Sequence, residues 1–147
     1  MQTLRTLIVA LVAGVALMGA ALGPASAQQE RPFFYNITTD DSWAAGMALA
    51  QANVAAGRGH DVTVFLNVRG VHLADRHAKT GTFPPAGKTP RQLLEALIGS
   101  GEKVLVCGAC MQVAGMGDDD LIDEALKASP KTTFGALEAP GAVVLSY

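Results

Sequence analysis

Short apolar runs alternate with amphipathic segments along the chain. The runs contain many β-branched and aromatic residues and almost no charge, which predicts strands buried on both faces, as in a parallel sheet. These predicted strands are Phe33–Ile37, Val62–Val68, Val104–Cys107 and Ala142–Ser146. Helices are expected between them, over Ser42–Ala56, Thr89–Ile98 and Gly108–Met116. Strands that alternate with helices predict βαβ units and an α/β fold.

Two of the expected helices carry clear signals in the sequence. In Ser42–Ala56, the four residues Trp43, Met47, Ala50 and Val54 fall on one face, as in an amphipathic helix. Thr89-Pro90-Arg91-Gln92 predicts a helix start, because Thr89 can cap, Pro90 fits the first helical position and Gln92 completes a capping box. The intervening residues 79–88 contain two glycines and two prolines and predict a loop, either a functional flap or oligomer contact, or a mobile surface segment.

The pattern over residues 118–139 is compatible with two divisions. Leu121, Ile122, Ala125 and Leu126 repeat at a helical spacing, which indicates a helix there. Ser129-Pro130, however, is itself a helix-start pair, so that a helix can also begin at Pro130. The residues alone leave both divisions open.

The first residues have the pattern of a cleaved export signal rather than of a folded element. Arg5 precedes an apolar run over 7–22, and Pro24-Ala25-Ser26-Ala27 follows with small residues typical of a signal-peptidase site. The run is short for a membrane-spanning helix and is interrupted by glycines. We therefore predict a signal peptide over 1–27, a single domain over 28–147 and a periplasmic protein that retains no membrane segment after cleavage.

Composition narrows the range of partners. The chain has a net charge of −2, few aromatic residues and no cluster of lysines or arginines. A protein that binds nucleic acid usually presents a basic patch, so no nucleic-acid partner is expected.

Cys107 and Cys110 follow the predicted strand that begins at Val104. In an α/β sheet, chemistry gathers at the carboxyl ends of strands, and a helix N-terminus favours the thiolate form of a nearby cysteine. A disulfide across so short a loop restrains little chain entropy, which favours a reactive pair over a structural one. The pair can carry a persulfide that the second thiol resolves, or cycle between dithiol and disulfide. Alternatively, the protein is a non-catalytic binding module or a subunit of an exported complex, in which the thiols form an inert disulfide.

Metal binding by these thiols is a further alternative. The sequence has no other cysteines to complete a zinc site, and nothing in it places His72 or His77 beside the thiols. Met111 and Met116 would suit Cu(I), a soft ion, although methionines at such positions more often fill a core. No cofactor and no metal are predicted.

The run from Lys103 to Met116 resembles the cysteine segment of the DsrE/DsrF-like family, which includes YchN-like and TusD-like sulfur-relay proteins. The resemblance extends over most of the chain after the signal and includes the Thr38–Asp41 turn, Gly59-His60-Asp61 and Leu121-Ile122-Asp123. It implies a three-layer αβα fold with a mostly parallel sheet of four or five strands, and assembly as a homotrimer or homohexamer. It also implies a short strand near Ala125–Lys127 and a helix from Pro130.

The resemblance implies a function as well. Cys107, placed ahead of Gly115, matches the working cysteine of TusD-like members, which accepts sulfane sulfur as a persulfide, and Cys110 matches the second cysteine of YchN-like members. Such a protein transfers sulfur between a donor and an acceptor, each a protein or a small thiol, rather than acting as a conventional turnover enzyme. Two features depart from the family pattern: Ala114 stands where family members usually have an arginine, and the export signal argues against the cytoplasmic tRNA-thiolation partners.

Overall fold

The computed structural model describes residues 31–147, and the predicted signal peptide therefore lies outside the described residues. Five parallel strands form one sheet in the order β4-β3-β2-β1-β5. Their bounds are β1 Phe33–Ile37, β2 Val62–Leu66, β3 Lys103–Val106, β4 Leu126–Lys127 and β5 Val143–Ser146. The prediction of a parallel α/β sheet is confirmed, with every pairing parallel.

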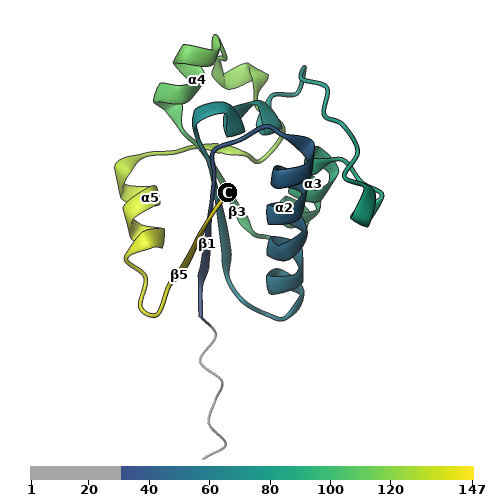
Figure 1. Ribbon diagram of the computed structural model, residues 1–147. Helices are drawn as coiled ribbons and strands as arrows, with labels where there is room; N and C mark the ends of the chain where they lie inside the picture. Colours follow the sequence, from purple (N-terminus) through teal and green to yellow (C-terminus); the bar gives the residue numbers. More distant parts are fainter. Residues whose placement is uncertain (1–30) are drawn as a thin grey trace, which may run out of the picture.

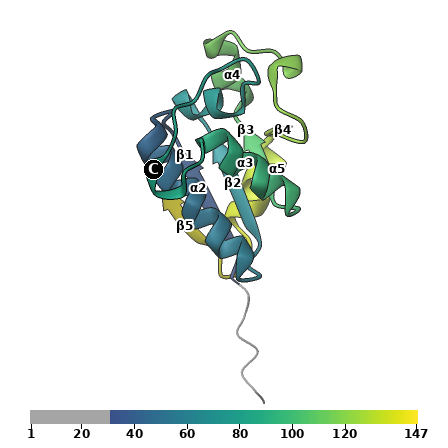
Figure 2. The same cartoon turned by 90° about the vertical axis from the view of Figure 1, so that its right-hand side faces the viewer.

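Helices cover both faces of the sheet, which gives three layers (Figures 1 and 2). The helices α2 (Ser42–Gly57) and α3 (Pro90–Gly99) lie on one face, and α5 (Pro130–Leu137) lies on the other. The short helix α4 (Gly108–Ala114) lies beyond the carboxyl ends of the strands, together with the 3₁₀ segment η2 (Val68–Ala74). Across residues 31–147, each helix is too short or too polar to cross a bilayer.

The helix α2 forms as predicted, but the face chosen for it from the sequence is the wrong one. Trp43, Met47 and Val54 point outward, and Trp43 is 60% exposed. The buried face carries mostly small residues: Ala45, Gly46, Ala48, Leu49, Ala52 and Ala55. Small side chains let the helix axis approach the sheet and α3 closely, so that face is the one that packs.

The structure resolves the ambiguity over 118–139 in favour of the division implied by the resemblance. A 3₁₀ turn, η4 (Asp118–Asp120), leads to the two-residue strand β4, and α5 starts at Pro130. The Ser129 side chain caps α5 by accepting a hydrogen bond from the Thr132 N–H at 3.2 Å. The helical spacing from Leu121 does not form a helix; Leu121 and Ile122 instead pack into the core. The predicted Thr89–Gln92 capping box is present at the start of α3.

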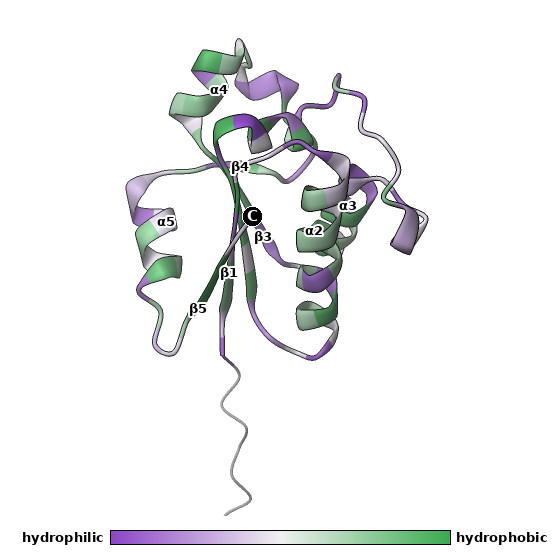
Figure 3. Ribbon diagram, in the orientation of Figure 1, coloured by the Kyte–Doolittle hydropathy of each residue, from purple (hydrophilic) through white to green (hydrophobic). Residues whose placement is uncertain are grey.

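The core lies between the sheet and the α2–α3 layer, where apolar residues (green in Figure 3) follow the strands. The loop over residues 79–88 is anchored to this core and contains a 3₁₀ turn, η3 (Pro84–Ala86). Phe83 is almost fully buried, packs against Gly46 of α2 and meets the Trp43 ring edge-on with centroids 5.9 Å apart. Phe83 therefore anchors the loop to the core, while most of the other loop residues are exposed.

Candidate functional site

Helix α4 begins directly where β3 ends, and Cys107 is the residue between them. Its backbone N–H donates to the Leu66 carbonyl at the end of β2, 2.9 Å away, and its own carbonyl accepts from the Met111 N–H at 2.9 Å. Cys107 is therefore held by a neighbouring strand and by the first turn of α4. Its side chain caps the helix, accepting a hydrogen bond from the Cys110 N–H at 3.3 Å.

The two thiols face each other at this position. Cys110 Sγ lies 2.7 Å from Cys107 Sγ and is the donor in the S–H···S contact between them. Both cysteines are free and partly exposed to solvent. Two donors of Cys110, its N–H and its S–H, thus converge on Cys107 Sγ. Such donors stabilise negative charge on a sulfur, and Cys107 Sγ is the sulfur that receives both.

Burial raises the pKa of the Cys110 thiol, and the contact with Cys107 raises it further. The Val68 backbone N–H acts in the opposite direction, because it can donate to the Cys110 sulfur and so favours the charged form. The raised pKa keeps Cys110 protonated at neutral pH. Cys110 is therefore the S–H donor of the pair, and Cys107 Sγ is the acceptor.

The segment η2 forms the opposite wall of the site. Val68 has φ +49°, a left-handed conformation in which a β-branched residue is strained. Two backbone hydrogen bonds attach the segment to the end of β1, from Asn67 N–H to the Ile37 carbonyl and from Arg69 N–H to the Thr38 carbonyl. A Cβ at Gly70 would lie 2.3 Å from the Ile37 carbonyl oxygen, so only glycine permits this approach.

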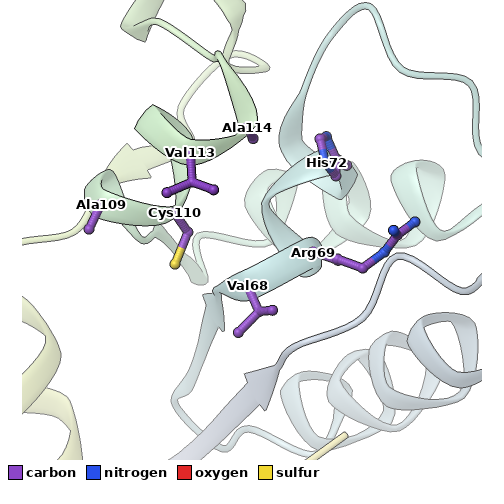
Figure 4. Close-up of a pocket in the computed structure, with 7 residues that line it drawn as sticks. All are labelled: Val68, Arg69, His72, Ala109, Cys110, Val113 and Ala114. Carbon is purple, nitrogen blue, oxygen red and sulfur yellow. The ribbon is translucent and has the colours of Figure 1, made fainter.

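A pocket of about 450 Å³ opens between η2 and α4, with Cys110 in its wall (Figure 4). Its lining residues are Val68, Arg69, His72, Ala109, Cys110, Val113 and Ala114. Val68 and Val113 are 61% and 91% exposed, although large apolar side chains are usually buried. The pocket thus combines the Cys110 thiol with an apolar rim.

The cation that lines the pocket is already paired. The Arg69 guanidinium donates two hydrogen bonds to the Asp40 carboxylate, each 2.9 Å long. Hydrogen bonding by Arg69 lowers the pKa of the Asp40 carboxyl group and keeps it ionised. Figure 4 shows the Arg69 side chain extending away from Cys110. Its charge is therefore directed toward Asp40 and not toward the thiols.

Gly108 lies under a side chain from β4. A Cβ at this position would meet Lys127 Cε at 3.0 Å, so the Lys127 stem passes directly over the first residue of α4. The Lys127 ammonium group is paired with Asp118 at 2.9 Å. Lys127 therefore links the start of α4 to the turn that follows it, and the glycine after Cys107 makes this possible.

The residues considered as metal ligands are dispersed. Met111 and Met116 are buried and belong to the hydrophobic core, and His77 lies at the surface 3.4 Å from Asp120. His72 lines the pocket from η2. Within residues 31–147, no group of three or more histidine, cysteine or acidic side chains is arranged to hold a metal ion.

The sequence indicated the two cysteines but not the residues that surround them. Val68, Arg69 and Val113 were not singled out as site residues, and His72 was considered only as a metal ligand that nothing placed beside the thiols. The η2 residues follow β2 and are distant from α4 in sequence. One general signal was available: β2 and β3 are neighbours, and the segments after adjacent parallel strands meet at the same edge of the sheet.

Comparison with known proteins gives the same fold. The family model described as the DsrE/DsrF-like family matches residues 33–141. The crystal structure of ychN protein from E. coli has a TM-score of 0.65 and 20% identity, and the match covers 79% of this chain and 99% of that one. A protein of unknown function, MTH1491 from Methanobacterium thermoautotrophicum, has a TM-score of 0.58 and 17% identity, with 80% and 99% covered. No curated protein matches the sequence. Because the family model spans most of the chain, this protein belongs to the DsrE/DsrF-like family.

Proposed function

We propose that this protein carries sulfane sulfur as a persulfide on Cys107, with Cys110 as its partner thiol. The observation that supports this most directly is the convergence of the Cys110 N–H and S–H on Cys107 Sγ, at 3.3 Å and 2.7 Å. These donors favour the thiolate, which is the form of cysteine that attacks sulfur. Membership of the DsrE/DsrF-like family is consistent with a fold of the sulfur-relay type.

The transfer needs no external oxidant. The Cys107 thiolate attacks the outer sulfur of a donor R–S–SH, the bond between the two donor sulfurs breaks, and R–S⁻ leaves. The product is Cys107–S–SH. An acceptor thiolate R′–S⁻ then attacks the outer sulfur, takes it as R′–S–SH and restores the Cys107 thiolate.

Cys110 has two roles in this scheme. Its S–H stabilises the Cys107 thiolate, and its raised pKa delays its own attack on a loaded Cys107. Once deprotonated, Cys110 attacks Cys107 Sγ, expels hydrosulfide and closes a disulfide, which unloads the protein without an acceptor. The proposed carrier thus works best where Cys110 keeps its proton.

The test is mass spectrometry of the intact protein after incubation with inorganic polysulfide. We expect a gain of sulfur in the wild type and in Cys110→Ser, and none in Cys107→Ser. Cys110→Ser cannot close the disulfide, so the absence of a sulfur adduct in this variant would contradict the proposal. A wild-type disulfide together with an unloaded Cys110→Ser would support the redox alternative. Retention of one Cu(I) per chain that is lost in either serine variant, without a sulfur adduct, would support metal binding.

The proposal includes the location and the assembly of the protein. Export follows from the predicted signal over 1–27 and is tested by N-terminal sequencing of the protein recovered from the periplasm, which should begin at Gln28. Assembly as a homotrimer or homohexamer is supported by the outward-facing Trp43, Met47 and Val54 of α2. Light scattering measures the mass directly, and a monomer at micromolar concentration would contradict this part of the proposal.

A further inference from the structure

We propose that the sulfur donor of this site is an uncharged, apolar sulfane-sulfur compound of the dialkyl trisulfide class, bound in the pocket between η2 and α4. This inference rests on the proposed persulfide function and specifies its donor. It depends on three features: the lining of the pocket, its charge, and the Cys110 sulfur in its wall, which lies 2.7 Å from Cys107 Sγ.

The lining of the pocket suits a small apolar molecule. Its volume of about 450 Å³ is in the usual range for small-molecule sites. Val68 and Val113 flank the Cys110 sulfur in Figure 4, and Ala109 and Ala114 contribute short apolar walls. Enclosing an apolar ligand would remove two strongly exposed valines from water, which favours binding.

The charges around the pocket give no advantage to an anionic donor. The Arg69 guanidinium is occupied by two hydrogen bonds to Asp40, and Ala114 supplies no charge. His72 lies across the pocket from the Cys110 sulfur in Figure 4. A thiosulfate or carboxylate group that entered beside the valines would lose hydration without gaining a free cation at the thiols.

The chemistry of a trisulfide R–S–S–S–R fits the adjacent thiols. The Cys107 thiolate attacks the central sulfur, one S–S bond breaks, and R–S⁻ leaves a Cys107–S–S–S–R intermediate. The released R–S⁻ then attacks the sulfur that carries the remaining R group. This step displaces Cys107–S–S⁻ and forms R–S–S–R, so that one sulfane sulfur moves to the protein without an oxidant or reductant.

The test compares two donors with the same trisulfide group and different chain ends: dipropyl trisulfide, which ends in methyl groups, and bis(2-carboxyethyl) trisulfide, which ends in carboxylates. The rate of Cys107 persulfide formation is measured for each by mass spectrometry after rapid quenching. We expect the propyl donor to react about tenfold faster or more, the size of effect that one misfitted group produces in an apolar pocket. Equal rates, or a faster carboxylate donor, would overturn the inference.

Two variants test whether the pocket causes this preference. Val113→Lys places a cation on the exposed pocket wall and is expected to reduce the ratio of propyl to carboxylate rates about two- to fivefold, the size of effect produced by one exposed charge pair. Val144→Lys is the matched control, because Val144 is half exposed on β5 and lies outside the pocket lining. It should leave the ratio unchanged; a ratio that changes equally in both variants would contradict a role for the pocket.

Inorganic polysulfide, applied in parallel, separates this inference from the proposed function. If polysulfide loads Cys107 while the two trisulfides react at equal rates, the donor class is wrong and the carrier function stands. If polysulfide leaves no sulfur on Cys107, the carrier function itself fails, and the donor inference fails with it.

Discussion

In the layer that α2 and α3 form against the sheet, side chains such as Ile37, Leu49 and Leu94 are completely buried. At the carboxyl end of the same sheet, η2 and α4 expose Val68 and Val113, and the Val68 backbone is left-handed. The first region is fixed by packing. The second also packs into the core, through Val71, Leu73 and Met111, but its exposed side is positioned by backbone hydrogen bonds to strand ends and by a few close approaches. Substitutions in the first should therefore change stability, and substitutions in the second should change both local geometry and thiol chemistry.

The largest expected effect is in the packed layer. Leu94→Ala removes a fully buried side chain of α3 and should lower the free energy of unfolding by about 2–5 kcal/mol, because a cavity replaces its contacts. Urea denaturation measures this change. The matched control Leu126→Ala truncates an exposed leucine on β4 and should change stability by about 0.5 kcal/mol or less. Similar losses in both variants would contradict the packing difference.

The junction between the two regions is sensitive at Gly70. Gly70→Ala puts a Cβ within 2.3 Å of the Ile37 carbonyl oxygen, so η2 must move from the end of β1. We expect a loss of about 1–3 kcal/mol in the free energy of unfolding, as for other overpacked sites, together with slower loading of Cys107. Gly99→Ala at the end of α3 is the control, since a Cβ there meets no atom within 4 Å. An unchanged loading rate in Gly70→Ala would show that η2 does not shape the site.

The strained backbone at Val68 predicts that a substitution there raises the free energy of unfolding, whereas the substitutions above lower it. Val68→Gly removes the side chain that disfavours φ +49° and should raise the free energy of unfolding by about 1 kcal/mol. The same substitution at Val113, in the regular helix α4, should lower it by a few tenths of a kcal/mol. Thermal unfolding of the two variants compares the signs. A destabilised Val68→Gly would mean that the valine side chain contributes more by contact than its backbone costs.

The features that could be predicted from the sequence are those that depend on neighbouring residues in the chain. The strands, the α3 capping box and the thiol pair were predicted because each depends on a local pattern of residues. The buried face of α2 was predicted incorrectly, since large apolar residues such as Trp43 were preferred over the alanines that allow close packing. The pocket was not predicted, because Val68 and Val113 come to line one site only through the pairing of β2 with β3.

The smallest expected effect concerns the ion pair beside the pocket. The Arg69 hydrogen bonds lower the pKa of Asp40 in the folded protein, so the carboxylate stabilises the fold above the ordinary aspartate pKa of about 3.9. That stabilisation is lost as the pH falls through the lowered folded pKa. Arg69→Met should therefore be slightly less stable than the wild type at neutral pH and equally stable in acid. Urea midpoints at the two pH values measure it, and a difference that persists in acid would point to lost packing rather than lost charge.

We propose that Cys107 carries the sulfur and that Cys110 is its partner thiol, although their Sγ atoms lie only 2.7 Å apart. Peptide mapping of the wild-type protein tests this most directly, after loading with inorganic polysulfide at neutral pH and alkylation of all sulfurs. We expect the additional sulfur on Cys107, and we expect Cys110 to be alkylated as a plain thiol. Additional sulfur found mainly on Cys110, or equally on both residues, would contradict it.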